Sequence, residues 1–254
     1  MSKKNRIVVR ELRPGRVQLD SAEAHYAIRV RRMRSGEQCI AFDPWAATQA
    51  EARLLIGGGS AAIDVGQVVP GRHLGWPGLV LCQALGKGDK AERVLRDAVA
   101  LGASEIVFVD TARSVPRRSD KTERSEARWQ SILLDAARQC ERSDLPRVAG
   151  PIAFDVAVLG DPAGVDVVFE PSGQVPSFLT VLDGVLSSES RGVGADHPLR
   201  LWVGPEGGFS EDELAQLIAR GAIGAALGPL VLRTELAATV VLACASARLQ
   251  SSRA

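Results

Sequence analysis

The sequence predicts a small β domain followed by a larger α/β domain with a largely parallel sheet. Three observations lead to this prediction. Short strand-like segments separated by turns fill residues 1–72. Beyond a linker containing Pro and Gly, over 73–254, short unbroken apolar segments alternate with helical patterns, as in sheets covered on both faces. One of these helical patterns, at 121–142, is the clearest periodicity in the chain.

The first domain is predicted to be a small β-barrel. Its expected strands lie at 6–12, 39–43, 51–56 and 61–69, and the sequence RPGR at 13–16 is expected to form a turn. One short helix is expected at Ser21–Met33, because the stretch DSAEAHYAIRVRRM offers an N-cap and a basic end. The second domain is expected to begin near residue 73, after Pro70-Gly71.

The second domain is expected to alternate strands and helices. In the 121–142 helix, the residues that share one face are apolar: Trp129, Ile132, Leu133, Ala136, Ala137 and Cys140. A shorter helix is expected at 89–102, ended by Gly102. The expected strands lie at 79–85, 105–110, 165–171, 199–205 and 221–228.

Composition narrows the function classes. No apolar run is long enough to span a bilayer and no secretory signal is evident, so we expect a cytoplasmic protein. The formal net charge is +1, but residues 1–72 carry 12 basic and 7 acidic residues, or +5. Of the 31 basic residues 26 are arginine, which suits phosphate contacts, although composition bias of the genome explains the excess equally well. The excess of basic residues in 1–72 therefore indicates a polyanionic partner that binds this part of the chain.

Metal and disulfide chemistry are not expected. The four cysteines are far apart and form no CxxC pair, so we interpret them as free thiols packed as small hydrophobic groups. The three histidines, His25, His73 and His197, are isolated, and no metal site is predicted.

The stretch VGPEGGFSEDE, at 203–213, joins an expected strand to an expected helix. Ser210 and Glu213 are spaced as a capping box, with Phe209 and Leu214 as a hydrophobic staple. The cap accounts for the helix start but not for the three glycines before it, at positions 204, 207 and 208. A plain tight turn and a ligand-binding loop remain equally open on this motif alone. The four nearby carboxylates would repel a polyphosphate, so a neutral or cationic nucleoside fits better.

A second loop favours the ligand-binding interpretation. The stretch ALGPLVLRTELAA, at 226–238, again places Gly-Pro at a strand end, followed by an arginine and a helix that begins near Thr234. The strand at 165–171 also ends in a polar turn. Ligands bind beyond the carboxyl ends of parallel strands, so three such loops can wall one pocket.

VGPEGGFSEDE followed by LGPLVLRTE resembles the family of ribosomal RNA small subunit methyltransferase E. QALGKGDKAERVLRDAVALGASEI resembles the family's lysine-bearing segment, and AEAHYAIRVRRMRSGEQCIAFD is similar to its N-terminal RNA-binding module. The resemblance implies methylation of N3 of a uridine in 16S ribosomal RNA, with S-adenosylmethionine as cofactor. It also implies a homodimer, an N-terminal PUA-like β-barrel, and a SPOUT domain with a C-terminal trefoil knot, an exception to the usual unknotted connections.

Site residues follow from the resemblance. The residues expected to bind the cofactor are Glu170, Pro171, Gly204, Pro205, Glu206, Gly207, Gly208, Leu227, Gly228, Leu232 and Arg233. The candidate catalytic residues are Arg233, which could stabilise developing negative charge, and Glu206 or Glu235, which could accept the uridine proton or offset the sulfonium charge. Two alternatives remain. Arg233 could form a simple ion pair with a carboxylate, and Glu235 could be an acidic residue of the first helical turn without a catalytic role.

The residues expected to contact RNA phosphates are arginines: Arg29, Arg31, Arg32, Arg34, Arg113, Arg117, Arg118 and Arg142. The sequence departs from the family pattern at Glu141, where the family usually has glycine. It also departs at Leu236, which replaces a threonine, and at Pro44, which replaces the glycine of an Asp-Gly turn. Two other functions stay open: a SPOUT methyltransferase acting on another RNA or atom, and an RNA-binding assembly factor without activity.

Overall fold

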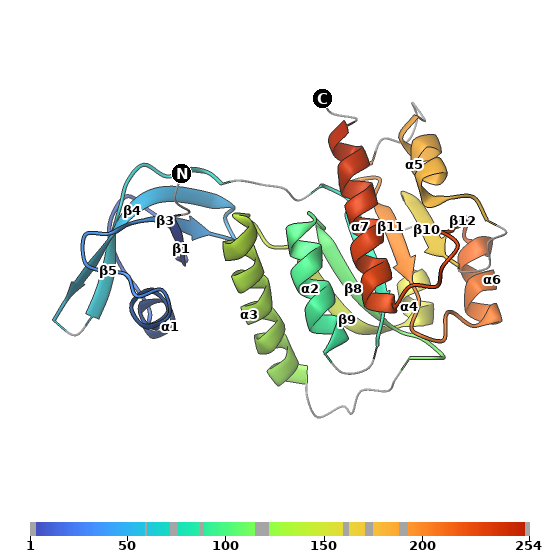
Figure 1. The fold of residues 1–254 in the computed structure, drawn as a ribbon, viewed down its shortest axis with the longest axis horizontal. Helices are drawn as coiled ribbons and strands as arrows, with labels where there is room; N and C mark the ends of the chain where they lie inside the picture. Colours follow the sequence, from blue (N-terminus) through green and yellow to red (C-terminus); the bar gives the residue numbers. More distant parts are fainter. Residues whose placement is uncertain are drawn as a thin grey trace. The chain divides into compact units, whose positions relative to one another are not determined.

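The structure is a computed structural model that describes residues 4–58, 60–71, 76–86, 89–114, 122–159, 163–170, 175–187 and 193–251 (Figure 1). The chain divides into two compact units. Unit 1 comprises Met1–Leu74 with Leu134–Leu145, and unit 2 comprises Gly75–Leu133 with Pro146–Ala254. The domain boundary that the sequence predicts, near residue 73, lies outside the described residues. Nothing in the sequence pattern indicates that 134–145 groups with unit 1.

Unit 1 is built on a six-stranded sheet in the order β1-β3-β4-β5-β2, with β6 paired to β4. Its strands are β1 (Asn5–Val8), β2 (Gly15–Gln18), β3 (Gln38–Asp43), β4 (Thr48–Gly57), β5 (Ser60–Val65) and β6 (Val69–Pro70). β1 and β3 pair in parallel, and the other described pairs are antiparallel. Ile7, Leu54 and Ile63 are fully buried in the core of this unit.

The helix of unit 1 is shorter than predicted. α1 (Ser21–His25) is capped by Asp20, whose side chain accepts the Glu23 N–H at 2.8 Å, and it continues as a π-helical turn, η1 (Tyr26–Val30). The prediction extended it to Met33. Instead, Arg32 adopts φ 53° and Met33 turns into the core, where 3% of it is exposed. Burial of Met33 therefore outweighs continued helical hydrogen bonding.

The end of α3 (Thr122–Cys140) packs within unit 1 through Arg138. Its guanidinium lies 4.1 Å from the Tyr26 ring centroid and forms an ion pair with the buried carboxylate of Glu23. Burial raises the pKa of Glu23, and the Arg138 charge opposes that rise. The predicted apolar face of α3 is confirmed, because Trp129, Ile132 and Leu133 are buried along its earlier turns.

Unit 2 is an α/β unit around a six-stranded sheet in the order β12-β10-β11-β7-β8-β9. Every strand pair in it is parallel, which confirms the predicted α/β sheet. Its strands are β7 (Leu79–Ala84), β8 (Glu105–Asp110), β9 (Arg147–Ala153), β10 (Val165–Phe169), β11 (Leu199–Val203) and β12 (Ile223–Ala225). Its other helices are α2 (Lys90–Ala100), α4 (Phe154–Val158), α5 (Phe178–Ser187), α6 (Glu211–Ala219) and α7 (Thr234–Ser251).

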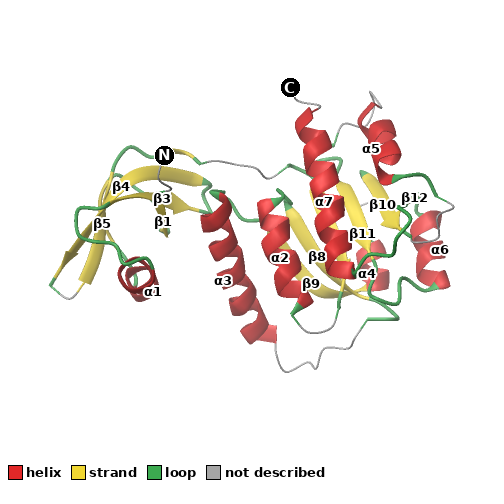
Figure 2. Cartoon of the chain, in the orientation of Figure 1, coloured by secondary structure: helices red, strands yellow, loops and turns green. Residues whose placement is uncertain are grey.

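Helices cover both faces of this sheet, as parallel sheets require. α2 and α7 lie side by side on one face (Figure 2). On the other face, Phe154 of α4 and Leu217 of α6 join a buried cluster with the strand residues Val80, Cys82 and Trp202. The residues that alternate with these along the strands, such as Leu81 and Leu201, are fully buried.

Several elements were missed by sequence reasoning. β2 includes Gly15 and Arg16, which were predicted to form a turn; it is a short edge strand, and its pairing with β5 overrides the turn signal. β9 contains Gly150-Pro151, a pair that reads as a loop, and proline is tolerated because β9 is the edge strand of its sheet. α4 and α5 had no predicted counterpart. α4 is a five-residue helix without a side-chain cap, so its sequence carries little signal. α5 does carry signals that the prediction overlooked: Ser177 accepts the Thr180 N–H as a cap at 3.2 Å, and the apolar residues at 178, 181, 182 and 185 have helical spacing.

Candidate functional site

Three neighbouring strands of unit 2 end at one edge of the sheet. β10 lies between β12 and β11, and all three run in parallel. Their last residues, Phe169, Val203 and Ala225, therefore deliver the loops that follow to the same place. This is the arrangement in which ligands bind beyond the carboxyl ends of strands.

The three loops enclose a cavity of about 330 Å³, here called the loop cavity. Nine residues expected to bind a cofactor line it: Glu170, Gly204, Pro205, Glu206, Gly208, Leu227, Gly228, Leu232 and Arg233. Of the remaining two, Gly207 is absent from the lining and Pro171 lies outside the described residues. Sequence reasoning missed Phe169, Val203, Leu230, Val231, Thr234 and Ala237. The apolar run PLVL before Arg233 was the one available signal for the two exposed residues, Leu230 and Val231.

Local chemistry fixes the loop that enters α6. The predicted capping box is confirmed: the Ser210 Oγ accepts the Glu213 N–H at 3.2 Å, and Glu213 Oε2 accepts the Ser210 N–H at 2.8 Å. Glu213 also accepts the Ala112 N–H at 2.7 Å, which joins this helix start to the end of β8. The cap thus holds one wall of the loop cavity at a defined position.

Glycine is required at particular points of the cavity wall. Gly208 has φ +70° and Gly228 has φ +144°, both in the region that residues with a Cβ rarely adopt. At Gly204 a Cβ would lie 3.2 Å from the Phe209 amide nitrogen, which is tighter than ordinary contact. The backbone therefore follows a path that favours glycine at these points, and it leaves space for a ligand to approach closely.

A hydrogen-bond chain ties the start of α7 to this wall. The Thr234 hydroxyl donates to the Gly204 carbonyl at 2.6 Å, and the Gln83 side chain at the end of β7 donates to that hydroxyl at 2.8 Å. Gln83 is buried and Thr234 is 5% exposed. Two walls of the loop cavity are thus joined by buried hydrogen bonds, which rigidify a site.

Three charged side chains meet behind the cavity wall. Lys90, at the start of α2, donates to Glu206, and its Nζ lies 3.5 Å from Glu235 Oε2. The Glu235 side chain is 8% exposed, so its carboxylate depends on the Lys90 charge. The hydrogen bond to Glu206 raises the pKa of Lys90. We call Lys90, Glu206 and Glu235 the charge cluster.

Gly86 makes room for the charge cluster. A Cβ on this residue would lie 3.0 Å from Lys90 Cδ and 3.4 Å from Glu206 Oε1. The sequence predicts that Lys90 lies at the start of a helix and that GKGDK belongs to a segment resembling the family, but no site role is predicted for Gly86 or Lys90. The signal was a glycine directly after a buried strand, beside a lysine at a helix start.

The structure separates the candidate catalytic residues. Arg233 is exposed and lines the loop cavity, and Glu206 lines it while held by Lys90. Glu235 is buried and does not line it. Arg233 is therefore the candidate with the best access to a bound substrate.

The arginines expected to contact RNA fall into different settings. Arg29, Arg31, Arg32 and Arg34 are exposed on unit 1. Arg113 is exposed on unit 2, where it donates to the carbonyls of Gly207 at 2.8 Å and Phe209 at 3.3 Å. Gly207 thus supports the cavity loop through Arg113 without lining the cavity. Arg117 and Arg118 lie outside the described residues.

Arg142 does not fit a phosphate contact. It is 1% exposed, and its guanidinium forms two hydrogen bonds of 2.8 Å with the Asp144 carboxylate. Its charge is therefore engaged inside unit 1. The preceding residue, Glu141, has φ 64°, a conformation that favours glycine, which is the residue that the family resemblance leads us to expect at this position.

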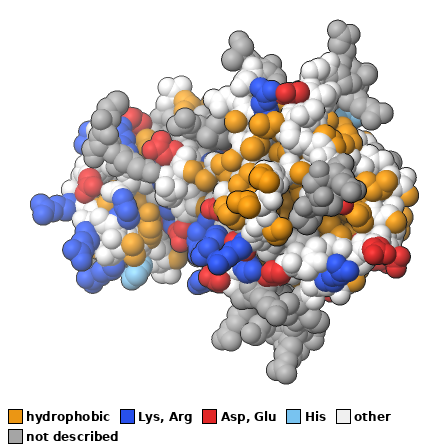
Figure 3. All heavy atoms as spheres, turned by 45° about the vertical axis from the view of Figure 1, so that its right-hand side comes forward, with side chains coloured by type: hydrophobic (Ala, Val, Ile, Leu, Met, Phe, Trp, Pro, Cys, Tyr) orange, Lys and Arg blue, Asp and Glu red, His pale blue; other side chains and the backbone are white. Residues whose placement is uncertain are grey.

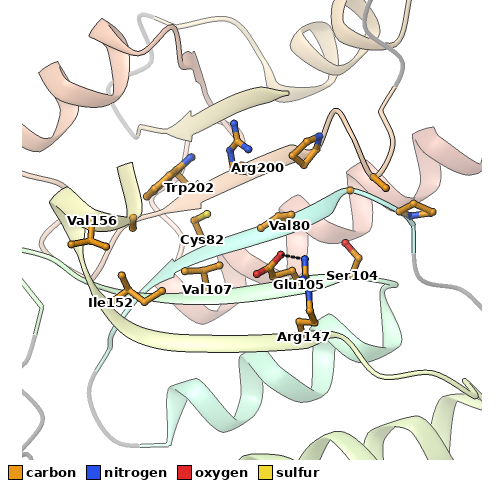
Figure 4. Close-up of a pocket in the computed structure, with 15 residues that line it drawn as sticks. Val80, Cys82, Ser104, Glu105, Val107, Arg147, Ile152, Val156, Arg200 and Trp202 are labelled. Atoms are coloured by element: carbon orange, nitrogen blue, oxygen red, sulfur yellow. Dashed lines mark hydrogen bonds and ion pairs between the residues drawn. The ribbon is translucent and has the colours of Figure 1, made fainter. Parts of the chain in front are cut away.

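A second and larger cavity, of about 510 Å³, lies on the other half of the unit 2 sheet (Figure 4). Its polar residues are mostly paired: Arg147 with Glu105 at 3.1 Å, and Arg200 with Asp166 at 2.7 Å. Burial raises the pKa of the Cys82 thiol there, so this thiol stays protonated and is not a nucleophile. The cavity runs along the face of the sheet, from Glu105 and Arg147 at the starts of β8 and β9 to Ile152 and Trp202 near the ends of β9 and β11, and none of the residues predicted to bind the cofactor lines it.

Among the described residues, no group of three or more His, Cys, Asp or Glu side chains is placed to hold a metal ion. His73 lies outside the described residues. No described helix is both long and apolar enough to cross a membrane.

Comparison with known proteins adds to this geometry. Residues 76–246 match the model of the RNA methyltransferase domain family. The chain is 32% identical to the ribosomal RNA small subunit methyltransferase E of Mycobacterium bovis, over 88% of this chain and 83% of that protein. It is 28% identical to the protein of the same name from Bacillus subtilis, over 88% of this chain and 87% of that protein.

Two solved structures have the same fold over nearly the whole chain. One is a methyltransferase from Legionella pneumophila in complex with the cofactor SAM (TM-score 0.83, 25% identity, 97% of this chain and 98% of that one). The other is a ribosomal RNA small subunit methyltransferase E from Neisseria gonorrhoeae bound to S-adenosyl methionine (TM-score 0.79, 24% identity, 94% and 95%).

Proposed function

This chain belongs to the ribosomal RNA small subunit methyltransferase E family, and we propose that it methylates N3 of a uridine in 16S rRNA. Family membership makes it an S-adenosylmethionine-dependent rRNA methyltransferase. The observation that carries the finer proposal is the glycine-walled loop cavity at the ends of β10, β11 and β12. Its substrate, the small ribosomal subunit, is assembled in the cytoplasm, where we expect the enzyme to act.

The residues of the loop cavity fit S-adenosylmethionine. Gly208 and Gly228 leave the backbone open to close approach, and Leu227 and Leu232 supply apolar wall. The carboxylates of Glu170 and Glu206 lie in the same lining and suit a cationic ligand. S-adenosylmethionine supplies an electrophilic methyl group on a sulfonium.

The protein contributes mainly by positioning. The Thr234, Gly204 and Gln83 hydrogen bonds hold the cavity walls in place, which reduces the loss of freedom needed to align the reacting groups. The uridine N3 proton must leave, so negative charge develops on the base. Arg233 is exposed at the cavity and is our candidate to stabilise that charge.

The two glutamates differ as candidate proton acceptors. Glu206 lines the cavity, but Lys90 donates to it, and Glu235 is buried behind the wall. We therefore assign Lys90 and Glu235 to supporting the wall, and we keep Glu206, which lines the cavity, as the carboxylate that a substrate could reach. Solvent water remains available as the final acceptor at this edge of the sheet.

A radiolabel experiment tests the proposed function. Small ribosomal subunits from a strain without the enzyme are incubated with methyl-labelled S-adenosylmethionine, and the modified base is mapped by mass spectrometry. We expect one labelled 3-methyluridine in 16S rRNA. Label on another atom or another RNA would favour a different SPOUT specificity. Binding of cofactor and RNA without transfer would favour an assembly factor.

We extend the proposal to the fold that the family resemblance implies, a PUA-like barrel in unit 1 and a trefoil knot at the end of unit 2. The β1-β3-β4-β5-β2 sheet with its single short helix supports the first. The second is supported by the path from β12 to α7: Thr234, the first residue of α7, bonds to Gly204 after β11 and to Gln83 of β7, although β10 and β11 lie between β12 and β7 in the sheet.

We also propose a homodimer formed through α7. Apolar side chains follow one side of this helix at Leu236, Val240, Ala243, Cys244 and Ala247, and all of them are exposed or half-buried. Leu230 and Val231, just before the helix, are 78% and 80% exposed. Hydrophobic side chains gather on one face of this unit (Figure 3). An exposed patch of this kind marks a protein interface.

Leu236→Glu should convert the dimer to a monomer, because a charge at the centre of an apolar interface is desolvated without a partner. Size-exclusion chromatography with light scattering measures the mass, expected to be twice 27.0 kDa for the wild type and 27.0 kDa for the variant. Ile218→Glu on α6 is the matched control, because Ile218 is 48% exposed and Leu236 47%. A monomeric wild type, or equal effects of both substitutions, would contradict the proposed interface.

A further inference from the structure

One exposed aromatic residue of unit 1 stands outside its hydrophobic core. Trp45, in the turn between β3 and β4, is 45% exposed and does not belong to the buried cluster of this unit. The guanidinium of Arg10, in the segment after β1, lies 3.8 Å from the centre of the Trp45 ring. The cation thus stacks on the indole, while a large part of the aromatic surface faces solvent.

A buried carboxylate builds this arrangement. Asp43 is 4% exposed, and its Oδ2 accepts the Glu11 N–H at 2.8 Å. Its Oδ1 accepts the N–H groups of Trp45 at 2.9 Å and Ala46 at 3.1 Å. One side chain therefore ties the Arg10 segment to the Trp45 turn, so their stacking is imposed by the backbone as well as by the side chains.

Both segments also hold unfavourable backbone conformations. Glu11 has φ 55° and Ala47 has φ 52°, in the left-handed region that residues with a Cβ rarely adopt. Each such residue costs about 1–3 kcal/mol and persists only where its surroundings fix it. The Asp43 hydrogen bonds supply that fixation.

We propose that Trp45 and Arg10 form a stacking platform for an unpaired base of the RNA substrate. The proposal rests on the proposed function, which supplies the RNA. Proteins recognise unpaired bases by stacking them on aromatic rings and arginine planes, and arginine also contacts the adjoining phosphate. Residues 1–72 carry 12 basic and 7 acidic residues, which favours an anionic partner over an apolar protein surface. The exposed arginines at 29–34 belong to the same unit.

The test compares Trp45→Ala, Trp45→Phe and Ile56→Ala in fluorescence anisotropy with a labelled single-stranded 16S rRNA fragment and with an RNA duplex. Ile56 is 40% exposed on β4, so its substitution controls for lost apolar surface. Trp45→Ala should weaken single-strand binding by about 5- to 150-fold, which corresponds to the about 1–3 kcal/mol that one stacked base contributes. Trp45→Phe should retain most of the affinity, and duplex binding should change less than twofold.

The outcomes separate this platform from the proposed function. If Trp45→Ala binds the single strand within twofold of the wild type, or loses duplex binding equally, the platform is wrong. Loss of binding to ribosomal subunits without loss of binding to the RNA fragment would assign Trp45 to a protein contact and also overturn it. If the wild type binds no RNA at all, the proposed function itself fails. Calorimetric affinity for S-adenosylmethionine should be the same in all variants.

Discussion

We expect Gly228→Ala to weaken the binding of S-adenosylmethionine by about tenfold or more. Gly228 has φ +144° at the cavity wall. A side chain there imposes about 1–3 kcal/mol of backbone strain, and each 1.4 kcal/mol of binding energy is tenfold in affinity. The strain is relieved if the loop moves, which removes one wall of the cavity. If the loop stays, the new methyl group occupies space at the wall. Isothermal titration calorimetry with S-adenosylmethionine measures the loss.

Gly221→Ala is the control for this experiment. Gly221 follows α6, has φ +94°, and a Cβ on it would meet nothing within 4 Å, as at Gly228. It does not line the loop cavity. Both variants should lose about 1–2 kcal/mol of unfolding free energy, because both force a left-handed conformation on alanine. Only Gly228→Ala should lose cofactor affinity. Equal affinities for the two variants would mean that the cofactor binds elsewhere.

Lys90→Met should have the largest effect on the charge cluster. The substitution leaves Glu235, whose side chain is 8% exposed, beside Glu206 without the cation that separates their charges. Breaking a buried pair costs about 3–5 kcal/mol, and we expect about 1–3 kcal/mol here because Lys90 is partly exposed. Displacement of Glu206 from the cavity wall should lower kcat/KM by about 10- to 100-fold. Chemical denaturation and steady-state methyl transfer measure the two effects.

The stabilising effect of Lys90 should depend on pH in a defined direction. Because the folded-state pKa of Lys90 is raised above its ordinary value of 10.5, its contribution to stability is fully present below that value. The contribution is lost as the pH rises through the raised pKa. The difference in unfolding free energy between wild type and Lys90→Met should therefore be constant at neutral pH and should shrink in strongly alkaline solution.

Three comparisons isolate the effect of the buried charge. Lys90→Arg keeps the cation and should retain most of the stability. The double variant Lys90→Met, Glu235→Gln should recover much of the loss, because the uncompensated buried carboxylate is removed. Lys4→Met removes an exposed pair with Glu51 and should change stability little. If the double variant is as unstable as Lys90→Met alone, Glu235 is not the source of the effect.

The sequence predicts those parts of the fold whose signals are local. The capping box at Ser210 and Glu213, the apolar face of α3 and the start of α7 at Thr234 each depend on residues close together in the chain, and all three were confirmed. The parallel sheet followed from unbroken apolar strands between helices. Because neighbouring parallel strands end at the same edge of a sheet, the sequence also predicts that the loops after these strands lie close together, although they are distant in the chain.

Other features depend on contacts between distant residues. β9 forms despite Gly150-Pro151, because β8 offers it an edge. Arg142 reads as a surface cation, but the fold buries it, and its carbonyl accepts a hydrogen bond from Arg6, far away in the chain, at 3.4 Å. Lys90 reads as an ordinary helix-start residue until the fold places Glu206 and Glu235 beside it. None of these pairings leaves a trace in local composition or period.

The order of the cavity walls along the chain has a consequence for synthesis. One wall follows β11, another follows β12, and the Thr234 hydrogen bond that joins them belongs to the first residue of α7, the last helix described. A nascent polypeptide that has left the ribosome only as far as β11 cannot form the site. Because ligand binding stabilises only the state that binds, cofactor uptake is linked to docking of α7. Substitutions along that helix should therefore weaken cofactor uptake even where they touch no part of the cavity.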